Sequence, residues 1–185
     1  MHPVTLPGRV VTLREFRVDD AIDAWAIVGD PEVTRSLSFD SRDLAATTKM
    51  LQDAIARAQV IPRTEYYLAV TLPDDQLIGF GRLGLDGVKA AKLGYAIRAN
   101  QWGRGYGTDA ARTLIDFGFG RLHLHRISAA IGPDNDRSIA LVKRLGMQYE
   151  GRIRHHVFTN GAWRDSLLYS VLTHEWPSYK QQQTA

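Results

Sequence analysis

The spacing of apolar side chains divides the 185-residue chain into strand-like and helix-like segments. Short segments that alternate apolar with polar residues and are rich in β-branched or aromatic side chains predict strands, whereas apolar residues at every third or fourth position predict helices. Turn residues separate these segments, and Asn160-Gly161 is a strong hairpin signal. The predicted strands are 10–14, 66–72, 77–85, 90–98, 126–131, 147–158 and 163–172. The predicted helices are 19–29, a helix of about four turns that Ser41 caps and Pro62 ends, 105–120 and 133–145.

The order of these elements, βααβββαβαββ, indicates a mixed α/β fold. No repeat or linker interrupts the order, so we expect the whole chain, 1–185, to form one domain. Its core is expected at about 10–176, followed by a polar tail at 177–185.

Composition narrows the classes of protein that this chain can be. Apolar residues make up 44% and charged residues 23%, which is ordinary for a globular domain. There is no cysteine, which excludes zinc-thiolate sites, iron–sulfur clusters and thiol nucleophiles. His123 and His125 lack a third ligand nearby, so no metal site is expected.

Charge and hydropathy bear on partners and location. The net charge is +3, and its basic residues are spread rather than clustered, so no nucleic-acid partner is expected. An acidic small molecule fits this mild excess. The first 14 residues lack the apolar core of a signal peptide, and no stretch approaches the ~18 apolar residues of a membrane span. We therefore expect a soluble, cytoplasmic protein that does not contact a membrane.

A glycine-rich loop is the most informative segment for function. Gly103, Gly105 and Gly107 stand at alternate positions between a predicted strand and a predicted helix. Glycines let a ligand approach the backbone closely, and the free N–H groups of a helix N-terminus favour phosphate. The spacing is not the G-x-G-x-x-G of dinucleotide sites, and no lysine precedes Thr108 as a Walker loop requires.

A second motif follows the loop after about thirty residues, from Asn135 through Ser138 to Leu145-Gly146-Met147. Together the two motifs resemble the GNAT family of N-acetyltransferases. That family has a Gln/Arg-x-x-Gly-x-Gly/Ala loop, here starting at Trp102, and an Asn-led motif ending in Leu-Gly-Phe. Trp102 and Met147 depart from these patterns. Further segments are similar to the branch of ribosomal-protein N-terminal acetyltransferases, the RimJ/RimL type, and they are 13–16, 19–21, 30–34, 77–79, 93–95 and 160–169.

The resemblance implies a GNAT-like fold and acetyl-CoA as the acetyl donor. It implies a mixed, bent sheet of six or seven strands, with helices on both faces. The two parallel strands 90–98 and 126–131 would diverge to admit the pantetheine arm. The loop N–H groups would hold the pyrophosphate, and the main chain before the loop would pair with pantetheine. The residues that the resemblance assigns to the donor are Tyr95, Ala96, Ile97, Gly103, Arg104, Gly105, Tyr106, Gly107, Thr108 and Asn135.

For two of these residues, Ile97 and Asn135, the resemblance also implies which group contacts the donor. The N–H of Ile97 would polarise the thioester carbonyl in the manner of an oxyanion hole with one donor. Asn135 would contact the cofactor arm through its side chain. A helix N-cap is the alternative role for Asn135, and the two roles are compatible.

The resemblance also implies direct attack of a primary amine on the thioester in a ternary complex. Relatives supply a proton from a tyrosine where this chain has Val142, so Ser138 is the candidate acid. Its alternative role is that of a first-turn helix residue.

The general base has several candidates. Relatives place a glutamate where this chain has Ala130, so the candidates here are Glu150, His155 and His156 on the following strand. Strand alternation puts the two histidines on opposite faces, so at most one of them faces the cleft. Solvated surface side chains, with a water chain in place of a base, are the alternative.

The acceptor expected from the resemblance is the N-terminal amine of a protein, of the ribosomal type. A small amine, such as a polyamine, an aminoglycoside or an amino acid, is the second choice. A non-catalytic acyl-CoA-binding regulatory module is the alternative from another class. Homodimers are common in the branch, so a homodimer is an expectation carried by the resemblance alone.

Overall fold

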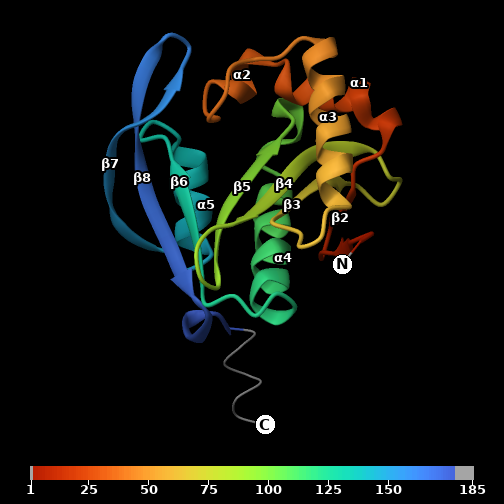
Figure 1. Ribbon diagram of the computed structural model, residues 1–185. Coiled ribbons are helices and arrows are strands. Elements are labelled where there is room, and N and C mark those ends of the chain that lie inside the picture. Colours follow the sequence, from red (N-terminus) through yellow and green to blue (C-terminus); the bar gives the residue numbers. More distant parts are fainter. Residues whose placement is uncertain (1, 178–185) are drawn as a thin grey trace.

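The computed structural model describes residues 2–177, so the predicted polar tail lies, apart from Pro177, outside the described residues. Eight strands form one mixed sheet in the order β1-β2-β3-β4-β5-β6-β8-β7 (Figure 1). The strands are β1 (Thr5–Pro7), β2 (Thr12–Glu15), β3 (Glu65–Thr71), β4 (Leu77–Leu85), β5 (Ala90–Ile97), β6 (Arg126–Ile131), β7 (Gln148–Thr159) and β8 (Ala162–Leu172).

Helices cover both faces of this sheet, as predicted (Figure 1). On one face of the sheet, α1 packs against β4 and α3 against β3. On the opposite face, α4 packs against β4 and β5, and α5 packs against β6. A buried apolar cluster fills each interface. The helices are α1 (Ala21–Val28), α2 (Pro31–Thr34), α3 (Leu44–Ala58), α4 (Tyr106–Gly120) and α5 (Asp136–Arg144), with 3-10 turns η1 (Val18–Asp20), η2 (Ala99–Gln101) and η3 (Thr173–Glu175). Within the described residues, no helix has the length and apolar character needed to cross a membrane.

The structure corrects three details of the sequence prediction. The sheet has eight strands rather than six or seven, because the three-residue β1 pairs with β2. The one-turn helix α2 was not predicted. Asp43, not Ser41, caps α3, since its side chain accepts from the Ala46 N–H at 2.7 Å. Ser41 instead contacts the Thr34 hydroxyl.

The centre of the sheet is where two strands part. β5 and β6 run parallel and pair only from Ala90 to Lys92 against Arg126 to Ser128. Beyond Lys92, β5 continues to pair with β4, while β6 continues to pair with β8. The two strands diverge, as predicted, and leave the edge of β5 from Leu93 to Ile97 without pairing to β6 (Figure 1).

Candidate functional site

The free edge of β5 presents main-chain groups of two residues to the space beside β6. The Arg98 N–H donates to the Ile78 carbonyl at 2.8 Å, and Ala96 stands opposite Phe80 in the same register. Because main-chain groups alternate sides along an antiparallel ladder, those of Ala96 point to β4, and those of Tyr95 and Ile97 point to the cleft. Ala96 is therefore a correction to the predicted donor-pairing set, since its main chain is committed to β4.

The glycine-rich loop leaves its backbone open to an approaching ligand. Gly103 (φ 78°) and Gly105 (φ 84°) adopt the left-handed conformation that glycine favours, and a Cβ at either would have no heavy atom within 4 Å. Gly105 is the N-cap of α4, with no side-chain cap hydrogen bond. Tyr106, Gly107 and Thr108 follow as its first turn, and Arg104 is exposed beside it. The N-terminus of this helix suits a phosphate-bearing group.

The start of α5 faces the loop across the cleft. Asn135 is the N-cap of α5, because its Oδ1 accepts from the Ser138 N–H at 3.1 Å. The N-cap role predicted for Asn135 is thus confirmed, and its amide NH₂ is the group that remains as a donor. The Arg137 guanidinium lies 4.3 Å from the centroid of the Trp102 ring, and the Trp102 indole N–H donates to the Ile97 carbonyl at 2.7 Å. Trp102 thus connects the end of β5 to α5.

Buried polar atoms without a partner gather around the strand divergence. Within residues 2–177, four buried side-chain atoms lack a hydrogen-bond partner, namely Tyr95 Oη, Arg98 Nε, Gln101 Oε1 and Arg164 Nε. Three of them lie on β5 or immediately after it, and the Arg164 guanidinium lies near Gly132, directly after β6. Buried polar groups are normally satisfied. Such a gathering therefore fits a site whose polar ligand completes the bonding.

Glu150 lies in an ion pair, so its carboxylate is not free to accept a proton from a substrate. Its carboxylate accepts from the Arg126 guanidinium through two hydrogen bonds, and the Ser170 hydroxyl donates to it as well. The hydrogen bonds from Arg126, with a further one from Ser170, lower the pKa of Glu150 to about 2. A carboxylate with so low a pKa is a weak general base at neutral pH.

The two candidate histidines lie on opposite faces of the β7–β8 hairpin, as predicted. His155 has φ 48°, and its ring stacks on Trp163 at 6.2 Å between centroids. The His156 Nδ1 lies 2.9 Å from the Ser166 Oγ. Ser166 shares a face of β8 with Arg164, because residues two apart along a strand point the same way. His156 thus lies on the face that looks toward the N-terminal helices.

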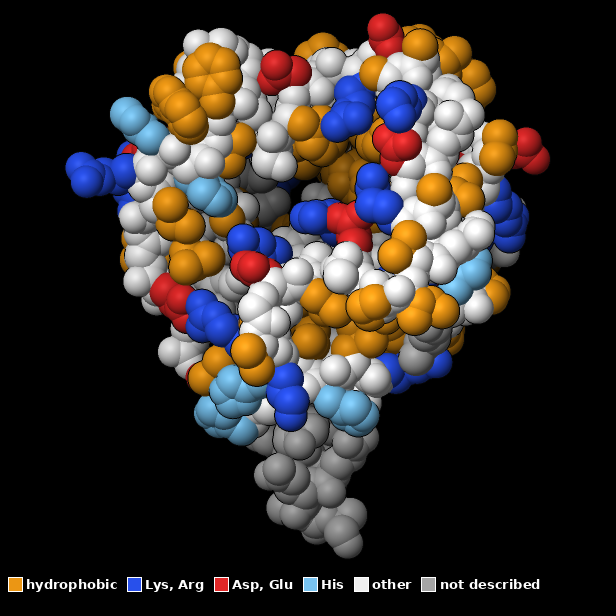
Figure 2. All heavy atoms as spheres, viewed as in Figure 1, with side chains coloured by type: hydrophobic (Ala, Val, Ile, Leu, Met, Phe, Trp, Pro, Cys, Tyr) orange, Lys and Arg blue, Asp and Glu red, His pale blue; other side chains and the backbone are white. Residues whose placement is uncertain are grey.

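The hairpin meets the segment that follows α2. The Arg164 guanidinium donates to the carbonyls of Arg35 at 2.6 Å and Leu37 at 2.5 Å. Nearer the hairpin tip, the Asn160 N–H donates to the Asp40 carboxylate at 2.7 Å. Figure 2 shows the surface hollowed between these two parts of the molecule, with charged side chains at the margin of the hollow.

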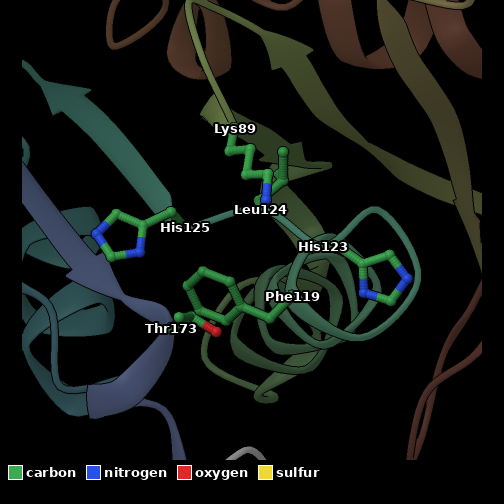
Figure 3. Close-up of a pocket in the computed structure, with 6 residues that line it drawn as sticks. All are labelled: Lys89, Phe119, His123, Leu124, His125 and Thr173. Atoms are coloured by element: carbon green, nitrogen blue, oxygen red, sulfur yellow. The ribbon is translucent and has the colours of Figure 1, made fainter.

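Two further concavities lie away from the loop. One of about 250 Å³ is lined by Phe119, Leu124, Thr173 and basic side chains, and Figure 3 shows the His123 and His125 rings pointing to opposite sides of it. A groove of about 630 Å³ runs along β1 and α4. Neither contains a residue of 103–108. Within the described part of the chain, no group of three or more His, Cys, Asp or Glu side chains could hold a metal ion.

The fold and site define a class of protein in which two parallel strands diverge beside a glycine-rich helix N-terminus. Proteins of this class bind an elongated, phosphate-bearing ligand between the two strands. The chain belongs to the GNAT family, because the model of the acetyltransferase (GNAT) domain matches residues 11–148. This confirms the family predicted from the two motifs. The protein is an acetyl-CoA-dependent N-acetyltransferase.

Individual relatives agree with this assignment. The chain is 30% identical to the uncharacterized N-acetyltransferase p20 of Bacillus licheniformis, over 93% of this chain and 98% of that protein. It is 32% identical to the ribosomal protein uS5-alanine N-acetyltransferase of Escherichia coli, over 60% of this chain and 59% of that protein. The structure of Mycobacterium smegmatis RimJ in complex with CoA-disulfide superimposes with a TM-score of 0.84 at 25% identity, over 99% of this chain and 95% of that one.

Proposed function

We propose that the acetyl group is transferred to the N-terminal amine of a protein, of the kind that ribosomal proteins present. The observation that carries this proposal is the hollow bounded by the hairpin and the segment after α2, which Arg164 holds together. An extended chain end presents its amine at the tip of a single narrow segment, which is the shape that a hollow accepts. The uS5-alanine N-acetyltransferase among the relatives supports the same acceptor class. A cytoplasmic location stays a prediction from the sequence.

In this proposal, the free edge of β5 and the glycine-rich loop hold the donor. Acetyl-CoA supplies an acetyl group as a thioester, whose carbonyl carbon an amine can attack. The loop N–H groups from Gly103 to Thr108 hold the pyrophosphate, and the main chain of Tyr95 and Ile97 pairs with the pantetheine arm as an added strand would. The Ile97 N–H then donates to the thioester carbonyl oxygen as negative charge develops there.

The proton chemistry uses groups on either side of the cleft. The amine must be neutral to attack, because an ammonium group has no lone pair. His156, on the inner face of the hairpin, takes the amine proton through water, and neutral imidazole suits this task near pH 7. Ser138 donates a hydrogen bond to the sulfur that departs. Glu150 instead joins β6, β7 and β8 through Arg126 and Ser170.

The test measures thiol release from acetyl-CoA with a panel of acceptors. The panel contains lysine-free peptides that copy ribosomal-protein N-termini, the same peptides with a blocked N-terminus, spermidine, an aminoglycoside and free amino acids. We expect turnover with the free peptides and none with their blocked forms. Turnover with spermidine or the aminoglycoside, together with none on any peptide, would replace the proposed acceptor with a small amine.

A further inference from the structure

Tyr95 carries a buried hydroxyl for which the mechanism above has no use. Its main chain belongs to the free edge of β5, and its ring lies beside the first turn of α4, with Cε2 3.7 Å from the position of a Cβ built on Gly107. Its hydroxyl is buried and has no hydrogen-bond partner within residues 2–177. Burying a hydroxyl without a partner is unfavourable, and phenylalanine would fill the same space without that cost. The hydroxyl therefore calls for a functional explanation.

The Tyr95 ring also lies close to α5, because Leu141 Cδ1 of α5 and Tyr95 Cε2 lie 3.4 and 3.7 Å from the same point, the Cβ position built on Gly107. Ser138 lies in the first turn of that helix. Burial raises the pKa of Tyr95 to about 12, and the adjacent Ser138 side chain opposes that rise. Tyr95 is therefore protonated throughout the physiological range and acts as a donor. The two hydroxyls come from β5 and α5, on opposite sides of the cleft, and a serine hydroxyl can rotate to accept one hydrogen bond while donating another.

Val142 on α5 cannot supply a hydrogen bond from its side chain, so Tyr95 and Ser138 are the hydroxyl groups that this part of the cleft offers. Val142, one turn after Ser138, is fully buried and has no polar atom to offer. The Ser138 N–H is already bonded to the Asn135 cap, which fixes the position of its Cβ at the start of α5. What remains free is the direction of the Ser138 hydroxyl hydrogen, and a second hydroxyl can set that direction.

We propose that Tyr95 is a positioning residue for Ser138: when CoA occupies the cleft, the Tyr95 O–H donates to the Ser138 Oγ, which directs the Ser138 O–H toward the sulfur of the departing CoA. This inference rests on the function proposed above. In the reaction the amine nitrogen bonds to the carbonyl carbon and gives up its proton to water. The C–S bond breaks, and its electron pair stays on sulfur, which later takes a proton from water. A hydrogen bond donated to Ser138 makes Ser138 a stronger donor to that sulfur.

The test measures the pKa of the CoA thiol in its complex with the protein, followed by the ultraviolet absorbance of the thiolate. This readout needs no acceptor, and a packing role for Tyr95 would not change it. We expect wild-type protein to hold that pKa below the value in Tyr95→Phe and in Ser138→Ala, by about one unit or tenfold in the ionisation constant. The double variant should show no further rise, because the two hydroxyls act in series.

Tyr149→Phe is the matched control, because Tyr149 is an exposed tyrosine on β7 whose ring contacts Tyr169. It should leave the thiol pKa as in wild type. CoA affinity and thermal unfolding are measured on the same samples. An unchanged thiol pKa in Tyr95→Phe with CoA still bound, or additive shifts in the double variant, would overturn the inference. Failure of wild-type protein to bind CoA would instead overturn the donor site on which the inference depends.

Discussion

The two parts of the sheet differ in how they are joined. From β1 to β5, each strand pairs with the next along the chain in an antiparallel ladder. β6, β8 and β7 form a second antiparallel unit, whose strand pairing with the first consists of three residue pairs between β5 and β6. The first unit gains its cohesion from regular pairing and two apolar clusters. The second unit does not pair with β5 beyond Lys92, so the main-chain donors on that edge of β5 are left for a ligand.

A second connection between the units lies at the far end of the cleft. Arg164 of β8 and Asn160 of the hairpin turn contact residues that follow α2. The cleft is thus bounded at one end by the β5–β6 pairs and at the other by hydrogen bonds of the hairpin. An opening bounded by polar contacts can change width more readily than one bounded by packed apolar side chains, because local stability follows buried apolar contact.

The largest expected effect comes from filling the open loop. Gly105→Val places a branched side chain in the space beside the helix N-terminus and strains a left-handed residue. Hydrogen bonds to a charged group contribute about 1.5–3 kcal/mol, so the loss of one or more predicts a roughly 10- to 100-fold fall in acetyl-CoA affinity by calorimetry.

Gly87→Val is the matched control for this change. Gly87 has φ 71° and, like Gly105, would have nothing within 4 Å of its Cβ, but it lies outside the loop in the turn between β4 and β5. The Gly87→Val variant should lose about as much free energy of unfolding as Gly105→Val and should keep the wild-type affinity for acetyl-CoA. Equal losses of affinity in both variants would show that strain alone, not occupation of the loop, weakens binding.

The next effect distinguishes the two edges of β5. The amides of Tyr95 and Ile97 face the cleft, whereas that of Ala96 faces β4. Hydrogen exchange followed by NMR should therefore show that CoA slows exchange at Tyr95 and Ile97 by about tenfold or more, because a new bond must open before exchange. Ala96 should exchange slowly with and without CoA. Uniform slowing along β5 would mean that CoA stabilises the sheet without pairing to this edge.

A smaller effect is expected at the hairpin connection. Arg164→Gln removes charge-assisted bonds to two carbonyls, and we expect KM for a peptide acceptor to rise by roughly tenfold while acetyl-CoA affinity stays unchanged. Arg152→Gln is the control, because Arg152 pairs with Asp165 elsewhere on the same hairpin. A rise in KM that is the same for both variants would assign the effect to the hairpin charge rather than to its contact with the segment after α2.

The smallest effect concerns the Glu150–Arg126 pair within the second unit. Both side chains are one-third exposed, so Glu150→Gln should lower the free energy of unfolding by less than about 1 kcal/mol at pH 7. Folding lowers the pKa of Glu150 to about 2, below the ~4.3 of an unfolded glutamate. The contribution is therefore complete above that unfolded value and is lost as pH falls toward 2. Denaturant unfolding at several pH values measures it.

The same variant decides the role of Glu150 in catalysis. A structural ion pair predicts that turnover at neutral pH is nearly unchanged in Glu150→Gln. A loss of turnover by two orders of magnitude, roughly the contribution of a general base, together with loss of the acidic limb of the pH profile, would make Glu150 that base despite its partner.

Local features of the chain could be predicted from the sequence. The left-handed glycines of the loop, the Asn135 cap and the Asn160-Gly161 turn each depend on a few neighbouring residues. Strand alternation likewise predicts that His155 and His156 face opposite ways. Every predicted strand of the central sheet is present, because periodicity reports on the conformation of its own segment.

Only the tertiary structure decided which distant side chains meet. Glu150 pairs with Arg126 from 24 residues away, and Arg164 reaches the carbonyl of Arg35 from 129 residues away. The commitment of the Ala96 main chain to β4 likewise follows from the register of β4 and β5. The pattern of a sequence shows which face of a strand is apolar, but a partner is chosen by the packing of the whole chain. For this protein, the sequence determined the family and the glycine-rich loop, and the fold determined which residues surround that loop.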